Sequence, residues 1–415
     1  MKKHMKKLLL SLLVIVGITA SGCFAKKPDI KNNTSKNGIE AVAEYGEKVA
    51  TTRNLQGEEE ILSVEGTIVE DVLTISDNLS LNNGDILLVK ISEKENVVAK
   101  EILEKISSNK YRVQDAEMED VFNNLDMKQE VQIVEDSLKE NSLPKGVRLV
   151  SDSDYARSVG IINSERVPEG LKYSVNDYVI YQDGDNALKV SANILLKTPK
   201  VNFDFSFRRR YMELTLDVGD SAKIDFIGNI NQKVEGKIDL GVYSIPLSAW
   251  GVPLGNIDVA LSMVVRADGK VDFEAKLTQD LDYKFGIQGK FFRELEVVNN
   301  ISLPESASDY LTFNMKSNGG VELASGMYPS ISYTLLQYKI VELGAEAGLN
   351  AKSNHELVSD SNINDENSDF GINAKYKAEI NPYLLLKWAV IGFEPNSTDL
   401  LADKDWTFEV EYTNK

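Results

Sequence analysis

The chain from residue 146 to its C-terminus is dominated by alternating apolar and polar positions. In Val201-Asn202-Phe203-Asp204-Phe205-Ser206-Phe207 every second residue is apolar, as a strand with one buried face requires. Comparable runs predict strands over 214–218, 224–230, 257–265, 271–277, 283–291, 311–315, 321–323, 331–349, 370–380, 384–393 and 406–412. We expect a large antiparallel β-sandwich or extended twisted sheet over 146–415, as one domain or two sub-domains.

Turn-forming residues separate several of these predicted strands. Arg266-Ala267-Asp268-Gly269-Lys270 predicts a β-hairpin, because Asp-Gly readily takes the positive φ of a type I′ turn. Asn318-Gly319-Gly320 separates two later strands. Arg208-Arg209-Arg210 could bind an anion, but in a strand Arg209 would point away from its two neighbours, so a hairpin end is the simpler interpretation.

A smaller β-rich domain with a short helix is expected over 57–140. Its apolar and β-branched runs are interrupted by the turn cluster Asn82-Asn83-Gly84-Asp85. Asp115 resembles a helix N-cap, followed by residues 118–125 with apolar positions on one helical face. The polar stretch from Glu135 to Lys145 then predicts the boundary with the large domain.

The N-terminus has the three-part layout of a secretory signal peptide. A basic head with four lysines precedes an apolar run from Leu8 to Ile18, which ends in the small residues Ala20-Ser21-Gly22. This run of eleven residues is too short for a spanning helix, which needs about 20 apolar residues. We expect residues 1–22 to be removed.

Ala20-Ser21-Gly22-Cys23 resembles the lipobox of bacterial lipoproteins, with Ala20 where that family usually has Leu. The resemblance implies that Cys23 becomes the first mature residue and carries a diacylglyceryl group and a palmitate chain. One acyl chain holds a protein to a membrane only weakly, whereas two or more anchor it stably. Residues 23–56 are then a flexible tether, with a short helix over Glu40–Val49. The competing interpretation is a signal cleaved elsewhere beside an incidental cysteine.

The net charge limits which classes of partner the protein can bind, and the cysteine content limits how its domains can be stabilised. Of the 46 Lys and Arg, four lie before Cys23, so the mature chain carries 42 basic against 64 acidic residues. Strong acidity argues against nucleic acid, which needs clustered Lys and Arg. Because Cys23 is the single cysteine, no disulfide can link the mature domains, and their apolar cores must stabilise them.

Few residues of the mature chain indicate catalysis or metal binding. Its one histidine, His355, falls in a polar stretch, Ser353–Asp369, that we expect to be a loop with a solvent-exposed histidine. The acids of this loop fail the calcium-loop pattern, because Asp365 and Gly371 stand where Gly and Glu are needed, counting from Asp360. We predict no catalytic, metal-binding or cofactor-binding residue.

The three tryptophans are the remaining candidates for binding. Trp250 lies in a loop bounded by prolines, whereas Trp388 and Trp406 fall in predicted strands. A loop tryptophan can stack on a sugar or anchor a protein partner, although a core position is favoured for all three.

We expect a non-enzymatic surface lipoprotein on the extracytoplasmic face of a bacterial membrane. Its role would be structural, or the binding of a protein or glycan, with the membrane contacted through the lipid. The alternative is a carbohydrate-active or other envelope-processing enzyme that uses paired carboxylates. An outer-membrane β-barrel is a third interpretation, opposed by strands that are too short and irregular.

Overall fold

The computed structural model describes residues 38–53, 59–76, 79–91, 97–161, 167–249, 251–290, 294–302, 311–317, 320–358, 373–390, 396–399 and 408–413. Strands dominate these ranges, so the expected mainly-β fold is confirmed. Their helical elements are short: α2 (Met118–Val121), the 3₁₀ helix η1 (Glu135–Ser137) and α3 (Asp152–Val159). A search of the described helices finds no membrane-spanning segment, since each is too short or too polar.

Two large sheets form the body of the molecule and contain nine described strands each. Sheet A contains β1 (Ile39–Glu40), β15 (Val234–Ala249), β16 (Val252–Gly269), β20 (Val321–Met327), β21 (Ser330–Leu335), β22 (Tyr338–Val358), β23 (Asn373–Val390), β24 (Asn396–Asp399) and β25 (Phe408–Thr413). Sheet B contains β2 (Val42–Tyr45), β10 (Phe122–Gln132), β11 (Val147–Leu149), β12 (Gly170–Asp183), β13 (Asn186–Ser206), β14 (Tyr211–Ile230), β17 (Val271–Lys290), β18 (Glu294–Ser302) and β19 (Leu311–Ser317).

A small closed barrel lies beside the two sheets. Its strands are β5 (Ser63–Val69), β6 (Val72–Ile75), β7 (Ile86–Ile91), β8 (Val97–Ser107) and β9 (Lys110–Asp115), and parallel pairing of β5 with β7 closes it. The two-stranded ribbon of β3 (Thr51–Arg53) and β4 (Glu59–Ile61) precedes it. The barrel has its own core around Leu73 and Tyr111, which are both fully buried.

The two large sheets share one apolar core, as a sandwich requires. Alternate residues of β13 and β14 point into this core, in agreement with the alternation predicted for Val201–Phe207. Aromatic side chains cross between the sheets: the Phe203 ring of sheet B lies 4.9 Å from the Tyr333 ring of sheet A, centroid to centroid. The hydroxyls of Tyr173 and Tyr243 also join the two sheets by a hydrogen bond.

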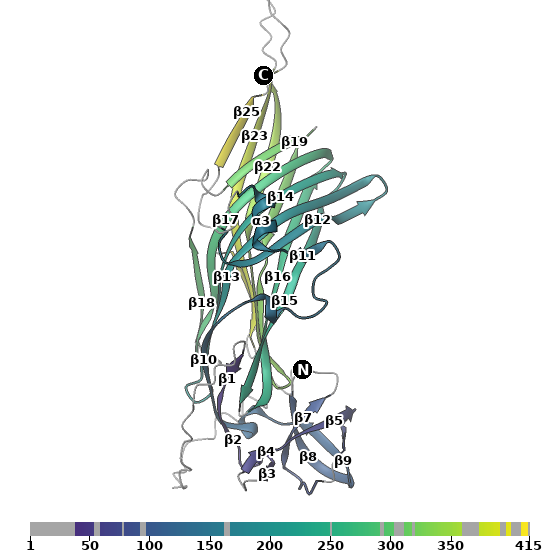
Figure 1. The fold of residues 1–415 in the computed structure, drawn as a ribbon, viewed down its shortest axis with the longest axis vertical. Coiled ribbons are helices and arrows are strands. Elements are labelled where there is room, and N and C mark those ends of the chain that lie inside the picture. Colours follow the sequence, from purple (N-terminus) through teal and green to yellow (C-terminus); the bar gives the residue numbers. More distant parts are fainter. Residues whose placement is uncertain are drawn as a thin grey trace, which may run out of the picture.

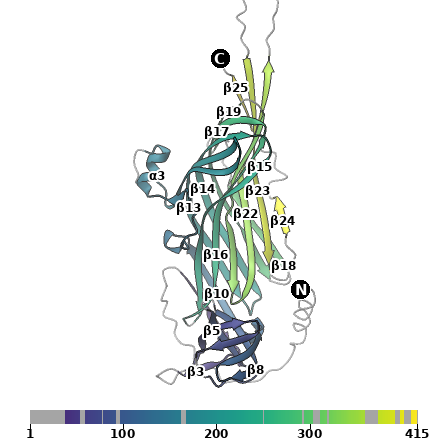
Figure 2. The same cartoon turned by 90° about the vertical axis from the view of Figure 1, so that its right-hand side faces the viewer.

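The molecule is elongated, with the barrel at one end (Figure 1). The sheet strands run along the long axis, and the view turned by 90° shows the two sheets as adjacent layers with α3 on the outer flank (Figure 2). β14 has 20 residues, which corresponds to about 65 Å at 3.3 Å per residue.

The first described segment does not continue the predicted tether. β1 pairs in parallel with the end of β15 in sheet A, and β2 pairs with β10 in sheet B, so residues 39–45 contribute to both sheets. The predicted helix over Glu40–Val49 is therefore wrong. Ile39, Ala41 and Ala43 are buried in the shared core, and this burial outweighs the local helical pattern.

The predicted boundary at Glu135–Lys145 is also displaced. The expected helix is reduced to α2, which has no side-chain N-cap, and Asp115 is the last residue of β9. The chain then enters β10 of sheet B, so the small domain ends before this strand. Within the expected boundary, the Lys139 ammonium lies 3.2 Å from the Asp258 carboxylate of sheet A.

The hairpin predicted at Asp268-Gly269 is wrong. β16 belongs to sheet A and β17 to sheet B, so this segment crosses from one sheet to the other. Asp268 and Gly269 pair instead with Glu322 and Val321, and the backbone of Gly269 lies outside the left-handed region. The strands on either side of Asn318-Gly319-Gly320 likewise belong to different sheets.

Two other predicted turns are confirmed. Asp85 N–H donates to the Asn82 carbonyl at 3.2 Å, and Gly84 has a φ of +89° that suits glycine. Residues 207–210 join β13 to β14, so the three arginines lie at a hairpin end. There Arg209 Nη2 is 2.7 Å from Asp204 Oδ1, which gives one of these arginines a structural role.

Candidate functional site

Several residues singled out in the sequence lie outside the described part of the chain. These are Cys23, Trp250, Trp406 and the acids 360–369 of the predicted polar loop. Trp388 is placed by its backbone in β23, opposite Leu343. The start of the predicted loop is wrong, because residues 353–358 continue β22 and His355 pairs with Tyr376 of β23. Of these candidates, the structure describes the backbones of Trp388 and His355, which do not adjoin, because Leu343, the partner of Trp388, lies far from His355 along β22.

A transverse polar zone in sheet B is the most unusual described feature. In the sequence, the mostly polar segments 219–223 and 278–282 interrupt two apolar runs and predict separate strands on either side. The structure instead contains uninterrupted strands, β14 and β17. Their interruptions lie side by side, because Ser221 pairs with Asp280 and Ala222 with Gln279. We call residues 197, 219–221 and 279–283 the polar belt.

The inner side of the belt faces the core. Asp220 and Gln279 are fully buried, and Gln279 Nε2 donates to Asp220 Oδ2 at 2.5 Å. Burial raises the pKa of Asp220 to about 7, although the Gln279 hydrogen bond opposes this shift. Tyr283 lies on the same inner face, and burial together with the Asp220 charge raises the pKa of its hydroxyl well above the usual value.

The outer side of the belt is an ion-pair cluster. Lys197 Nζ hydrogen-bonds to Asp280 and lies 3.3 Å from Asp282 Oδ1. Burial lowers the Lys197 pKa, but the hydrogen bonds and charges of Asp280 and Asp282 together outweigh burial and raise it overall. The β13 register shifts between Lys197 and Lys200, so a bulge marks the belt on this strand too.

Helix α3, which the sequence analysis did not predict, packs on the outer face of sheet B. The Ser151 hydroxyl accepts the Asp154 N–H at 3.2 Å at its start, and Gly160 ends it at a φ of +83°. Tyr155 packs in a small cluster with Leu195 of β13, and Lys223 donates to the Val159 carbonyl. The signals that could have revealed this eight-residue helix are its Ser cap and terminal Gly.

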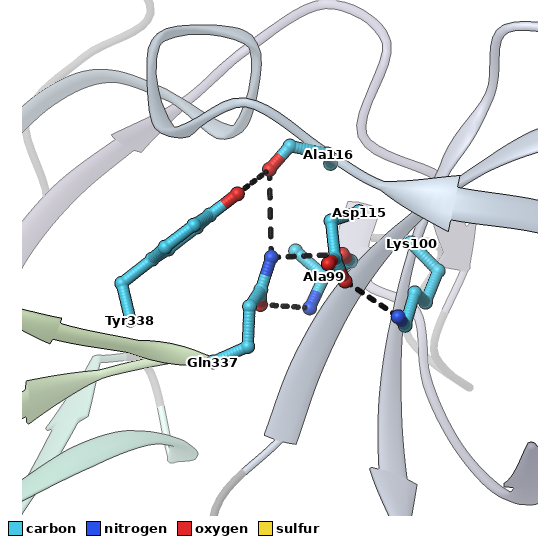
Figure 3. Close-up of polar contacts among 6 residues, drawn as sticks. All are labelled: Ala99, Lys100, Asp115, Ala116, Gln337 and Tyr338. Atoms are coloured by element: carbon cyan, nitrogen blue, oxygen red, sulfur yellow. Dashed lines mark hydrogen bonds and ion pairs between the residues drawn. The ribbon is translucent and has the colours of Figure 1, made fainter. Parts of the chain in front are cut away.

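The junction between the barrel and the sheets is a second polar site (Figure 3). Gln337, in the turn between β21 and β22, accepts the Ala99 N–H at 3.0 Å and donates to the Ala99 carbonyl at 3.3 Å. Tyr338 donates to the Ala116 carbonyl at 2.8 Å. Gln337 thus pairs with β8 much as another strand would.

Neither site has the composition of a common metal centre. Within the described ranges, no three His, Cys, Asp or Glu residues are grouped so that they could hold a metal ion. The buried Asp220 can exchange a proton and accept hydrogen bonds, and the junction can fix the barrel to the sheets. Neither site is evident from the alternation pattern alone, although the acidic residue at an inward position of β14 is a signal for the first.

The chain was also compared with known proteins. No family model, curated protein or solved structure matches it.

Proposed function

We propose that this protein is a lipid-anchored surface protein of a bacterial envelope, with a structural or ligand-binding role and no catalytic one. The anchor is Cys23, in the lipobox-like sequence Ala20-Ser21-Gly22-Cys23. The partner at the membrane is the lipid bilayer, and the ligand of the exposed part is a protein or a glycan.

The observation that carries this proposal is the Ala20-Ser21-Gly22-Cys23 sequence directly after the apolar run, and strand β1 locates where the following segment joins the fold. β1 pairs with Leu247 and Ser248 near the end of β15, and Val49 forms a bridge with Ile86 of the barrel. The chain thus enters at the barrel end of the elongated molecule (Figure 1). An anchor on this side would place the barrel near the membrane and the opposite end of the sandwich furthest from it.

The environment of Asp220 favours a structural role over carboxylate catalysis. A general acid or base must reach its substrate within hydrogen-bonding distance. Asp220 has the near-neutral pKa that such a group needs, yet its side chain is completely enclosed in the core. Asp220 can therefore affect how the sheets pack, but it cannot contact a substrate.

The anchor is tested by Cys23→Ala in the producing bacterium. We expect this change to move the protein from the membrane fraction to the soluble fraction and to abolish incorporation of labelled palmitate, because the thiol is the acylation point. Ser21→Ala, which keeps the thiol and a small residue before it, is the matched control and should stay in the membrane.

Retention of Cys23→Ala in the membrane fraction would contradict the lipid anchor. The circular dichroism spectrum of the released protein should remain that of a β-rich fold, which separates loss of the anchor from misfolding.

A further inference from the structure

Three polar atoms in the polar belt lack a hydrogen-bond partner among the described residues. They are Asp220 Oδ1, Gln279 Oε1 and the Tyr283 hydroxyl, and all three side chains are buried in the core. Asp220 is opposite Leu281, so Gln279 and Tyr283 are its two diagonal neighbours on the inner face of β17. The three groups therefore belong to one polar cluster inside an apolar core.

Leaving such groups unpaired would be costly, because a buried polar atom without a hydrogen bond costs about 1–3 kcal/mol. Their donor and acceptor pattern fits one small molecule. With Asp220 ionised, a water can donate its two protons to Asp220 Oδ1 and Gln279 Oε1 and accept the proton of the Tyr283 hydroxyl. With Asp220 protonated at Oδ1, that O–H donates to the water, which still donates to Gln279 Oε1. Three hydrogen bonds to otherwise unsatisfied groups are typical of a buried water.

We propose that Asp220, Gln279 and Tyr283 form an internal site between the two sheets that binds one water molecule and one exchangeable proton. The proton resides on the Asp220 carboxyl when the site is neutral. At higher pH it passes to solvent, and an uncompensated carboxylate remains in the core. The site makes the packing of the sandwich dependent on pH.

The charged groups around Asp220 favour this behaviour. Asp280 and Asp282 on β17 disfavour a charged Asp220, whereas Lys197 on β13 favours it. In sheet A, the described residues that face the core are apolar except for a few uncharged hydroxyl groups such as those of Ser325 and Tyr333. No described cation on that side compensates the carboxylate.

The direction in which folding stability changes with pH follows from the upward shift of the Asp220 pKa. The Asp220 pKa is about 7 in the folded protein against an ordinary 3.8. Its contribution to stability is fully present below about pH 4 and is lost as the pH rises to about 7. Between pH 5.5 and 8.5, Asp220 should raise the unfolding equilibrium constant about 30-fold.

The test uses the soluble Cys23→Ala chain and two further variants in that background, Asp220→Asn and Asp217→Asn. Asp217 is an exposed carboxyl on the same strand and serves as the matched control. Urea unfolding at pH 5.5 and 8.5 should show the 30-fold effect in the parent and in Asp217→Asn, while Asp220→Asn lacks it. Infrared spectra of the parent at pH 5.5 should contain the carbonyl band of a buried protonated carboxyl, which Asp220→Asn removes.

The same pH dependence in all three proteins, or no such infrared band in the parent, would overturn the proton site. The water is tested separately by a high-resolution crystal structure of the parent. We expect density within hydrogen-bonding distance of both Asp220 Oδ1 and Gln279 Oε1, and a dry cluster would refute the water site.

Discussion

Glu346 is a buried acid whose charge is balanced by a specific partner. Its side chain is 2% exposed and accepts two hydrogen bonds from the Arg266 guanidinium, one of them 2.9 Å long. Arg266 is itself 26% exposed and also lies 3.3 Å from Glu235. This fork links β16 to β22 across the intervening strand β20. Asp220 differs, because its hydrogen-bond partner among the described residues is the neutral amide of Gln279.

Glu346→Ala should lower the free energy of unfolding by about 2–4 kcal/mol, because it leaves a partly buried guanidinium without its main partner. Glu342→Ala is the control on the same strand. Glu342 is exposed and pairs with Lys339 only three residues away, so its loss should cost less than about 0.5 kcal/mol. Denaturant unfolding of both variants measures the difference, and equal losses would show that the buried pair contributes nothing special.

At the scale of elements, the turn between β21 and β22 determines how the barrel is attached. Gln337 reaches from this turn to both backbone groups of Ala99 in β8. The neighbouring Tyr338 binds the Ala116 carbonyl, close to where the chain leaves the barrel for sheet B. Two adjacent side chains thereby hold both the barrel and its exit segment (Figure 3).

Gln337→Ala should loosen this attachment while leaving the barrel folded. Without the Gln337 carbonyl, the Ala99 N–H loses its acceptor, and we expect its hydrogen exchange to accelerate by about tenfold, equivalent to about 1.4 kcal/mol. Hydrogen–deuterium exchange with resolution at β8 is the measurement.

Gln114→Ala is the control within the barrel, because the exposed Gln114 side chain donates a hydrogen bond to Glu101 of the same barrel and does not reach the junction. An unchanged rate at Ala99 in the Gln337 variant would show that other contacts hold the barrel in place.

At the scale of the whole molecule, the proposed anchor and the elongated shape together predict an orientation. Residues 24–37 number 14 and can span at most about 50 Å. The long strands of the sandwich extend about 65 Å, and the barrel lies beyond them (Figure 2). The barrel end should therefore lie closer to the membrane on average than the turn between β12 and β13.

This orientation can be measured because Cys23 is the only native cysteine and would be acylated. A fluorophore on Ser108→Cys in the barrel should transfer more energy to acceptor lipids than one on Asp185→Cys in the turn between β12 and β13. Both positions are exposed turn residues. Equal transfer, or greater transfer from residue 185, would contradict the proposed orientation.

The alternation of side chains was enough to predict a mainly-β fold, since it reports directly which strand face is buried. The turn-forming residues of Asn82–Asp85 also located that turn, and the opposed side-chain directions expected within a strand indicated a hairpin end at Arg208–Arg210. The lipobox resemblance is similarly local, and the anchor at Cys23 remains a prediction.

Contacts between residues distant in sequence decided which strands pair and which polar groups are buried. Asp268-Gly269 has the residues of a hairpin, yet β16 pairs with β15 and β20 in sheet A, whereas β17 pairs with β14 in sheet B. Asp220 interrupts an apolar run in the sequence, but pairing with β13 and β17 on either side carries β14 through the polar belt. Local sequence specifies which side chains could face a core, whereas only tertiary pairing determines which strand covers them and which polar groups are enclosed.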